Sequence, residues 1–382
     1  MKKVAILGST GSIGVNCLDV ISQFPKKFSV AGLSAYNNVD LLESQAKRFK
    51  PAFVALQTKN VLSLRRRLNN GIKILDLEKI SEIFYYKDID IIVLGISGGA
   101  ALIPLWEAVK AGKTIALANK EAFVMAGSLI MDLAKKTSAK IIPVDSEQSA
   151  IFQCLNGQDV KTLNKIYLTA SGGSLKSVPK ERFSRLSVDD VLKHPRWKMG
   201  RKITVDCATL MNKGLEIIEA MWLFNVGAKS IEVVIHKEAI IHSMVEFVDG
   251  TILAQLGITD MRLPIQYALT YPERLSSNLS QIDFYKLKQL SFERPNLNKF
   301  PCLALAYTAA KDCGTSPCVL NAANEISVKA FLDGRIKFNK IPHIIEQVLS
   351  KHKRIINPSL EEIILSDKWA REEAESLITT YK

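Results

Sequence analysis

The sequence has no long apolar run without charges. Its longest uncharged stretch extends from Ile91 to Trp106 and is broken by a Ser-Gly-Gly turn and a proline, whereas a membrane-spanning helix needs about 20 apolar residues. After the opening MKK, the apolar run covers only residues 4–7, which is too short for the hydrophobic region of a signal peptide. We therefore expect a cytoplasmic protein that has no targeting extension and no membrane partner.

The sequence also lacks the cysteine patterns that are typical of zinc sites and disulfide frameworks. The six cysteines include no CxxC pair and no histidine at zinc-finger spacing. This argues against a structural zinc site and against a disulfide framework, so we expect reduced thiols.

Acidic residues are fewer than basic ones, 38 against 51, and the formal net charge is +13. Such a charge suits nucleic acid, small anions or simply a solvated lysine-rich surface. The basic residues are spread along the chain, with one tight cluster at residues 65–67. Because no nucleic-acid-binding signature accompanies them, we expect no nucleic-acid partner.

The chain of 382 residues suits two or three domains. Within residues 1–145, short β-rich runs alternate with helical patterns, which predicts an α/β domain with a doubly wound parallel sheet of the Rossmann type. The expected strands read KVAIL, FSVAGLSA, AFVAL, IKIL, DIIVLG, TIALAN and KIIPVD.

The pattern changes after residue 145. Residues 146–275 predict an α+β domain with the strands KIYLTA, KITVD, IEVVIH and ILAQL and one long helix from about Ala208 to Phe224. Residues 276–301 are polar and irregular, which is typical of a connector. Residues 302–382 carry helical spacing and predict a small C-terminal helical bundle.

A glycine motif, GSTGSIG, follows the first strand and opens a helix near Ile13. Gly8, Gly11 and Gly14 allow a tight turn and let backbone N–H groups approach a pyrophosphate at the positive end of a helix. The spacing is GxxGxxG rather than GxGxxG, and such turns also occur without a ligand.

The end of the second strand bears on the choice of cofactor. An NAD site usually places an acid there for the ribose 2′-hydroxyl. The segment Ala35-Tyr36-Asn37-Asn38 contains no carboxylate, so nothing in it repels a 2′-phosphate. It therefore favours NADPH over NADH.

Two carboxylates, Asp145 and Glu147, end the run KIIPVDSE. In an extended segment, side chains two residues apart point the same way, so the pair could share a cation or simply form a solvated strand end. A third acid, Glu216, would share one helix face with Asn212 and Lys213. Three carboxylates suit a hard cation such as Mg²⁺ or Mn²⁺, which can hold a hydroxyketone.

Three further motifs are candidates for a site. In ALANKE, residues 119–121 end a strand at the edge where ligands collect, although a lysine there is often a surface residue. In TASGGS, Ser171 begins a polar turn that could hold a phosphate together with Asn212 and Lys213, or could be an ordinary turn. Residues 194–200, HPRWKMG, suit a lid or a loop with a core tryptophan. His236 and His242 are expected to be core histidines.

These motifs occur together in one known family. GSTGSIG, ALANKE, PVDSEQSAIFQ, LTASGG, HPRWKMG and VDCATLMNKGLE stand in its order and spacing. Over nearly its whole length the sequence resembles 1-deoxy-D-xylulose 5-phosphate reductoisomerases of the non-mevalonate isoprenoid pathway. The resemblance implies a homodimer that uses NADPH and a divalent metal, Mg²⁺, Mn²⁺ or Co²⁺. It would rearrange 1-deoxy-D-xylulose 5-phosphate and reduce it to 2-C-methyl-D-erythritol 4-phosphate.

The resemblance also implies roles for individual residues. The metal ligands would be Asp145, Glu147 and Glu216, and these three with Lys120 and His194 would be the catalytic residues. The cofactor contacts would be Thr10, Gly11, Ser12, Ile13, Asn37, Asn38, Asn119, Glu121 and Gly200. The substrate contacts would be Lys120, Ser146, Glu147, Ser171, His194, Trp197, Cys207, Asn212, Lys213 and Glu216, with Trp197 on a closing flap.

The sequence departs from the family pattern at a few positions. Cys207 stands where serine is usual on the phosphate side, and a thiol is the weaker hydrogen-bond donor, so we expect a raised KM for substrate. Lys237 and Ala239 replace the proline and serine of an HPxS motif, and Tyr36 replaces a glycine near the adenosine ribose.

Two other functions compete with the enzyme. A nucleotide-sensing regulator without turnover would explain the glycine motif but not three acids and a tryptophan lid. A nucleic-acid binder would explain only the charge.

Overall fold

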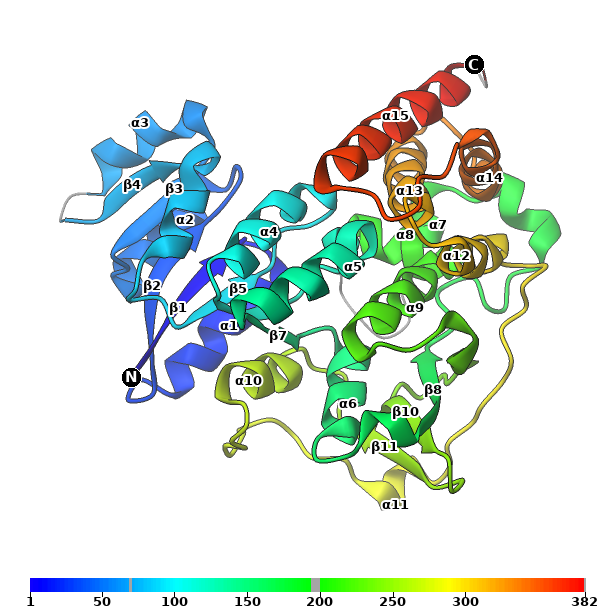
Figure 1. Cartoon of the computed structure of the whole chain (residues 1–382), viewed down its shortest axis with the longest axis horizontal. Coiled ribbons are helices and arrows are strands. Elements are labelled where there is room, and N and C mark those ends of the chain that lie inside the picture. The colour runs from blue at the N-terminus through cyan, green and yellow to red at the C-terminus, as the bar shows by residue number, and fades with distance from the viewer. Residues whose placement is uncertain (69–70, 194–199, 381–382) are drawn as a thin grey trace. The chain divides into compact units, whose positions relative to one another are not determined.

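The chain forms two compact units in the computed structural model, which describes residues 1–68, 71–193 and 200–380 (Figure 1). Unit 1 contains Met1–Ala122, Ile130–Ser149 and Asp260–Leu279. Unit 2 contains Phe123–Leu129, Ala150–Thr259 and Ser280–Lys382. The domain boundaries expected at residues 145, 275 and 301 stay a prediction.

Unit 1 is built on a seven-stranded sheet in the order β4-β3-β2-β1-β5-β6-β7, with all neighbours parallel. All seven strands expected from the sequence are present, at β1 (Lys2–Leu7), β2 (Phe28–Ser34), β3 (Phe53–Leu56), β4 (Lys73–Asp76), β5 (Ile91–Leu94), β6 (Thr114–Leu117) and β7 (Lys140–Pro143). β3 and β5 are buried along their whole length, which fits the continuous apolar runs of a covered parallel sheet. Strand order reverses between β1 and β5, the point where such sheets bind ligands.

The helices of unit 1 cover and connect these strands. They are α1 (Ser12–Gln23), α2 (Val39–Phe49), α3 (Thr58–Arg67), α4 (Leu102–Lys110) and α10 (Arg262–Thr270), with 3₁₀ segments at η1 (Leu77–Tyr85) and η2 (Gly99–Ala101). α5 (Lys120–Thr137) and α6 (Ser146–Leu155) contain residues of both units. α10 packs on α1, and Arg262 Nη1 lies 3.0 Å from Asp19 Oδ2.

Unit 2 contains a four-stranded mixed sheet in the order β11-β10-β8-β9. The strands are β8 (Leu163–Ala170), β9 (Ile231–Ile235), β10 (Ile241–Phe247) and β11 (Ile252–Leu256). β8 and β9 run parallel, whereas β10 is antiparallel to both of its neighbours. β10 adds a strand to those expected from the sequence.

One expected strand is wrong. The run KITVD lies in helix α8 (Arg201–Thr209), which is followed by α9 (Met211–Phe224). Lys202 and Asp206, four residues apart, form a 2.8 Å ion pair along the helix, a contact that an extended segment could not make. The single long helix expected from about Ala208 is instead two helices, which meet at Leu210 in a left-handed conformation with φ 59°.

The C-terminal part is helical, as expected. α12 (Pro301–Asp312), α13 (Ser316–Leu332), α14 (Ile341–Lys351) and α15 (Leu360–Thr379) form the group drawn from orange to red in Figure 1. α13 packs against the other three, and α12 packs against α9. The shorter elements of unit 2 are α7 (Val188–Leu192), α11 (Phe284–Leu287), η3 (Val160–Thr162), η4 (Lys180–Arg185), η5 (Ala228–Ser230) and η6 (Phe338–Lys340). Within the described ranges, no helix is both long and apolar enough to cross a bilayer.

Candidate functional site

The glycine turn after β1 is shaped by close backbone contacts. Gly8 has φ +87°, and a Cβ there would lie 2.6 Å from the carbonyl oxygen of Gly95. A Cβ on Gly14 would lie 2.3 Å from Cα of Ser9, so any side chain at either position would force the turn and α1 apart. The predicted cofactor residues Thr10, Gly11, Ser12 and Ile13 occupy this turn and the start of α1. The first turn of α1 carries no acid, which leaves its positive end available to an anion.

The end of β2 leads into a capped helix. The Oδ1 atom of Asn38 accepts the N–H of Leu41 at 3.1 Å and caps α2. Asn37 precedes it, and the side chain of Tyr36 is exposed. The segment expected to face the ribose thus presents polar and aromatic groups without a carboxylate.

Three predicted residues lie together at the carboxyl edge of the unit 1 sheet. Asn119, buried after β6, caps α5 by accepting the Ala122 N–H at 2.8 Å. Its Nδ2 atom donates to the Ile96 carbonyl at 2.9 Å and to Glu121 Oε2 at 3.1 Å. Lys120, which follows Asn119, is buried and forms an ion pair with Asp145, which lies just after β7.

Asp145 and Glu147 do not lie in one extended segment, in contrast to what their spacing after a strand predicts. β7 ends at Pro143 and α6 begins at Ser146, which places Glu147 in the first turn of a helix. The hydroxyl of Ser146 donates to Glu147 Oε2 at 2.6 Å. Carboxylates at the start of a helix are favoured by its positive end.

In unit 2, the turn after β8 packs on α8. Gly173 has φ +68°, and a Cβ there would lie 2.4 Å from the carbonyl oxygen of Cys207. The N–H of Gly173 donates to Ser171 Oγ at 3.4 Å. Two predicted phosphate-side positions, Ser171 and Cys207, are therefore held on neighbouring segments.

The predicted polar face of α9 is confirmed. Glu216 is fully buried, and its two carboxylate oxygens accept from Asn212 Nδ2 at 2.5 Å and from Lys213 Nζ at 2.6 Å. A buried charge needs such partners. The ion pair with Glu216 thus fixes the position of the Lys213 side chain on α9.

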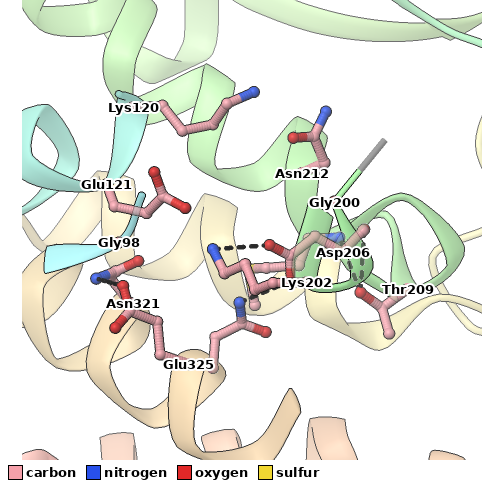
Figure 2. A network of polar contacts seen from close by, with 12 residues as sticks. Gly98, Lys120, Glu121, Gly200, Lys202, Asp206, Thr209, Asn212, Asn321 and Glu325 are labelled. Carbon is pink, nitrogen blue, oxygen red and sulfur yellow. Dashed lines mark hydrogen bonds and ion pairs between the residues drawn. The ribbon is translucent and has the colours of Figure 1, made fainter. Parts of the chain in front are cut away.

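A second polar network in unit 2 was not anticipated (Figure 2). Asp206 is buried and accepts from Lys202 Nζ at 2.8 Å. It also accepts from Asn324 Nδ2 at 2.8 Å. It joins α8, which carries Cys207, to α13. The four-residue spacing of Lys202 and Asp206 was a detectable helix signal, whereas nothing in the sequence links residue 206 to residue 324.

His194 and Trp197 lie outside the described residues, and Gly200 caps the start of α8. His236 is a core histidine as expected, since its Nε2 atom accepts the N–H groups of Ile240 and Ile241. At the unusual HPxS segment, Ala239 adopts φ 54°.

The cysteines behave as free thiols. Burial raises the pKa of Cys154 to about 11 and that of Cys302 to about 12. Both thiols therefore stay protonated and unreactive at neutral pH.

Comparisons with known proteins agree along the chain. Three family models match: 1-deoxy-D-xylulose 5-phosphate reductoisomerase at residues 4–127, its C-terminal domain at residues 141–224, and the DXP reductoisomerase C-terminal domain at residues 256–373. The 1-deoxy-D-xylulose 5-phosphate reductoisomerase of Thermoanaerobacter pseudethanolicus is 50% identical over 97% of this chain and 98% of its own length. That of Thermodesulfovibrio yellowstonii is 50% identical over 99% and 100%.

Solved structures give the same result. The Zymomonas mobilis enzyme in complex with NADPH matches with a TM-score of 0.92 and 37% identity, covering 99% of each chain. A reductoisomerase in complex with NADPH, fosmidomycin and magnesium matches with a TM-score of 0.94 and 40% identity, covering 99% of this chain and 98% of the other. The chain belongs to the 1-deoxy-D-xylulose 5-phosphate reductoisomerase family.

Proposed function

We propose that the protein binds NADPH and a divalent metal ion and converts 1-deoxy-D-xylulose 5-phosphate into 2-C-methyl-D-erythritol 4-phosphate. Family membership over almost the full length carries this proposal. The solved relatives were crystallised with NADPH and with magnesium. A regulator without turnover is not favoured, because it would not require the acid and lysine pairs described above.

The cofactor site proposed lies at the switch point of the unit 1 sheet. Thr10, Gly11, Ser12 and Ile13 would bind the pyrophosphate through the start of α1. The further contacts proposed are Asn37, Asn38, Asn119, Glu121 and Gly200. Bound there, NADPH would supply the hydride.

The metal ligands proposed are Asp145, Glu147 and Glu216. Their donor set is purely carboxylate oxygen, which suits Mg²⁺ or Mn²⁺ and also accepts Co²⁺. An ion held by them would polarise the ketone of the substrate. Lys120 already pairs with Asp145, and Lys213 with Glu216, so each ammonium would keep its carboxylate charged and oriented.

The remaining proposed roles concern the substrate. Lys213, Asn212, Ser171 and Cys207 offer an ammonium, an amide, a hydroxyl and a thiol, which together suit a phosphate. Ser146, Lys120 and His194 would contact the sugar carbons and hydroxyls, and Trp197 would belong to a flap that excludes water.

The protein is further proposed to be a homodimer located in the cytoplasm. Among the described residues, β11 has a strand neighbour on one side only, and Ile252 and Leu253 on it are exposed. Unpaired apolar edge strands tend to be covered by a partner. Analytical ultracentrifugation should give a dimer mass, and cell fractionation should find the protein in the cytosol.

The direct test of the reaction is NADPH oxidation by purified protein with 1-deoxy-D-xylulose 5-phosphate and Mg²⁺ or Mn²⁺. We expect oxidation that stops with excess chelator, and a branched polyol phosphate as product by mass spectrometry. A folded protein that binds NADPH but oxidises none with either metal would leave only the sensor function.

A further inference from the structure

A buried glutamine is bonded to the glycine turn that follows β1. Gln45 lies on α2, in the stripe with Leu42 and Ala46 that faces the core. A helix position of this kind normally holds an apolar residue, and burying an amide is costly unless both of its ends are hydrogen-bonded. The position therefore calls for an explanation.

Both ends of the Gln45 amide are bonded to one residue, Ser9. The Nε2 atom of Gln45 donates to the Ser9 carbonyl at 2.8 Å, and the Oε1 atom of Gln45 accepts from the Ser9 hydroxyl at 2.8 Å. A carbonyl can only accept, so the orientation of the amide is fixed. The two bonds hold the backbone and the side chain of Ser9 at once.

Ser9 is held from β2 as well. Its N–H donates to the Ser34 carbonyl at 2.7 Å, and the N–H of Gly8 donates to Ser34 Oγ at 3.1 Å. The side chains of Ser9, Ser34 and Gln45 are all buried. The first two N–H groups of the turn are thereby directed to β2, while the first N–H groups of α1 have no partner within the helix.

The position of Ser9 determines that of α1. A Cβ on Gly14 would lie only 2.3 Å from Cα of Ser9, so the helix and the turn are in direct backbone contact. A shift of Ser9 would move the helix end that the proposed function assigns to the pyrophosphate. Binding of an anion by backbone N–H groups depends on their being held in place beforehand.

We propose that Gln45 is a positioning residue for the dinucleotide, which acts through Ser9 without touching the cofactor. This inference rests on the proposed NADPH site and adds to it a residue outside the glycine motif. α2 begins after its cap Asn38, beside the segment expected to face the ribose. Gln45 thus connects the pyrophosphate turn to the helix that begins at the ribose segment.

The test compares two glutamine-to-methionine variants of the full-length protein. Gln45→Met keeps the length of the side chain and removes both bonds. Gln266→Met is the matched control, since Gln266 is also buried in unit 1 and donates to the Leu275 carbonyl at 2.9 Å. For each variant, NADPH affinity is measured by fluorescence titration, kcat and KM by turnover, and Tm by thermal unfolding.

We expect the Kd and KM for NADPH of Gln45→Met to rise about tenfold, as for the loss of one to two buried hydrogen bonds. Its kcat and its KM for substrate should stay within about twofold. Gln266→Met should lose a similar amount of thermal stability and keep its NADPH affinity. A purely structural role for Gln45 would give the two variants the same kinetic profile, and that result would overturn the inference.

A second variant covers the case in which Gln45→Met does not fold. Ser9→Ala removes the hydroxyl that donates to Gln45 Oε1 at 2.8 Å and that also lies 3.1 Å from the Ser34 carbonyl oxygen, and we expect about threefold weaker NADPH binding. Where both fold, the loss of affinity in the double variant should be smaller than the sum of the two single losses, because both changes remove the contact between Gln45 and the Ser9 hydroxyl. Unchanged NADPH affinity in Ser9→Ala and additive losses in the double variant each contradict the inference. If the wild-type protein fails to bind NADPH, it is the proposed function that fails.

Discussion

Replacing Asp206 by asparagine tests how strongly the network between α8 and α13 stabilises unit 2. The carboxylate accepts from Lys202 Nζ and Asn324 Nδ2, both at 2.8 Å. The amide of the variant has one oxygen, which could still accept from Asn324. The ammonium of Lys202 would then face an N–H₂ group, or at best a neutral oxygen, in place of a charged carboxylate. Removing one partner of a fully buried ion pair costs about 3 to 5 kcal/mol.

The expected cost is at the lower end of that range or below it. The side chain of Asp206 is 2% exposed but that of Lys202 is 28% exposed, so water can hydrate the ammonium of Lys202 when the carboxylate is lost. We therefore expect Asp206→Asn to lower the free energy of unfolding by about 2 to 3 kcal/mol.

Urea unfolding followed by circular dichroism gives this value. The matched control is Glu232→Gln, which breaks the 2.8 Å pair of Lys165 and Glu232 in the same unit, where the side chains are 30% and 52% exposed. That change should cost less than about 1 kcal/mol. Equal stability losses in the two variants would refute the argument from burial.

Two further predictions concern the cysteine at the phosphate side and a histidine of the C-terminal helices. Cys207→Ser restores a stronger donor, so KM for the substrate should fall about two- to threefold at constant kcat; an unchanged KM in steady-state kinetics would show that the thiol is not near the phosphate. Burial holds the pKa of His352 below its usual 6.5, so the folded state favours the neutral ring. As the pH falls below 6.5 the unfolded chain binds a proton more readily than the folded one, and the free energy of unfolding therefore decreases. Thermal unfolding on both sides of this pH should show a drop in Tm that is smaller in His352→Gln, and equal drops would contradict the assignment.

Most of the fold follows from local patterns in the sequence. The seven strands of the unit 1 sheet are short apolar runs separated by helical segments, and each run forms a strand because a parallel sheet buries both of its faces. The glycine turn is only partly local, since Gly14 is required by a close contact with the backbone of Ser9, whereas Gly8 is required by a contact with Gly95 on a distant segment. The helical C-terminal part was predictable from the 3.6-residue spacing of its apolar residues.

The errors concern helical segments whose residues were assigned to strands, and a contact between residues that are distant in sequence. The β-branched run KITVD forms helix α8, because Lys202 pairs with Asp206 along the helix and Asp206 is bonded to Asn324 on α13. Glu147 begins a helix rather than extending a strand, although its neighbour Asp145 lies at the strand end as expected. Gln45 was missed because its partner Ser9 is distant in sequence, yet a polar residue in an apolar helical stripe was a visible signal.

Asp145, Glu147 and Glu216 are proposed to hold one divalent ion, and the proposed reaction depends on this site. Titration with Mn²⁺, followed by electron paramagnetic resonance in the presence of NADPH, tests it in the wild-type protein, in Glu216→Gln and in the control Glu232→Gln. We expect one tightly bound ion per chain in the wild type and the control, and an affinity at least about tenfold weaker in Glu216→Gln. The same Mn²⁺ affinity in all three proteins would show that Glu216 is not a ligand of the ion.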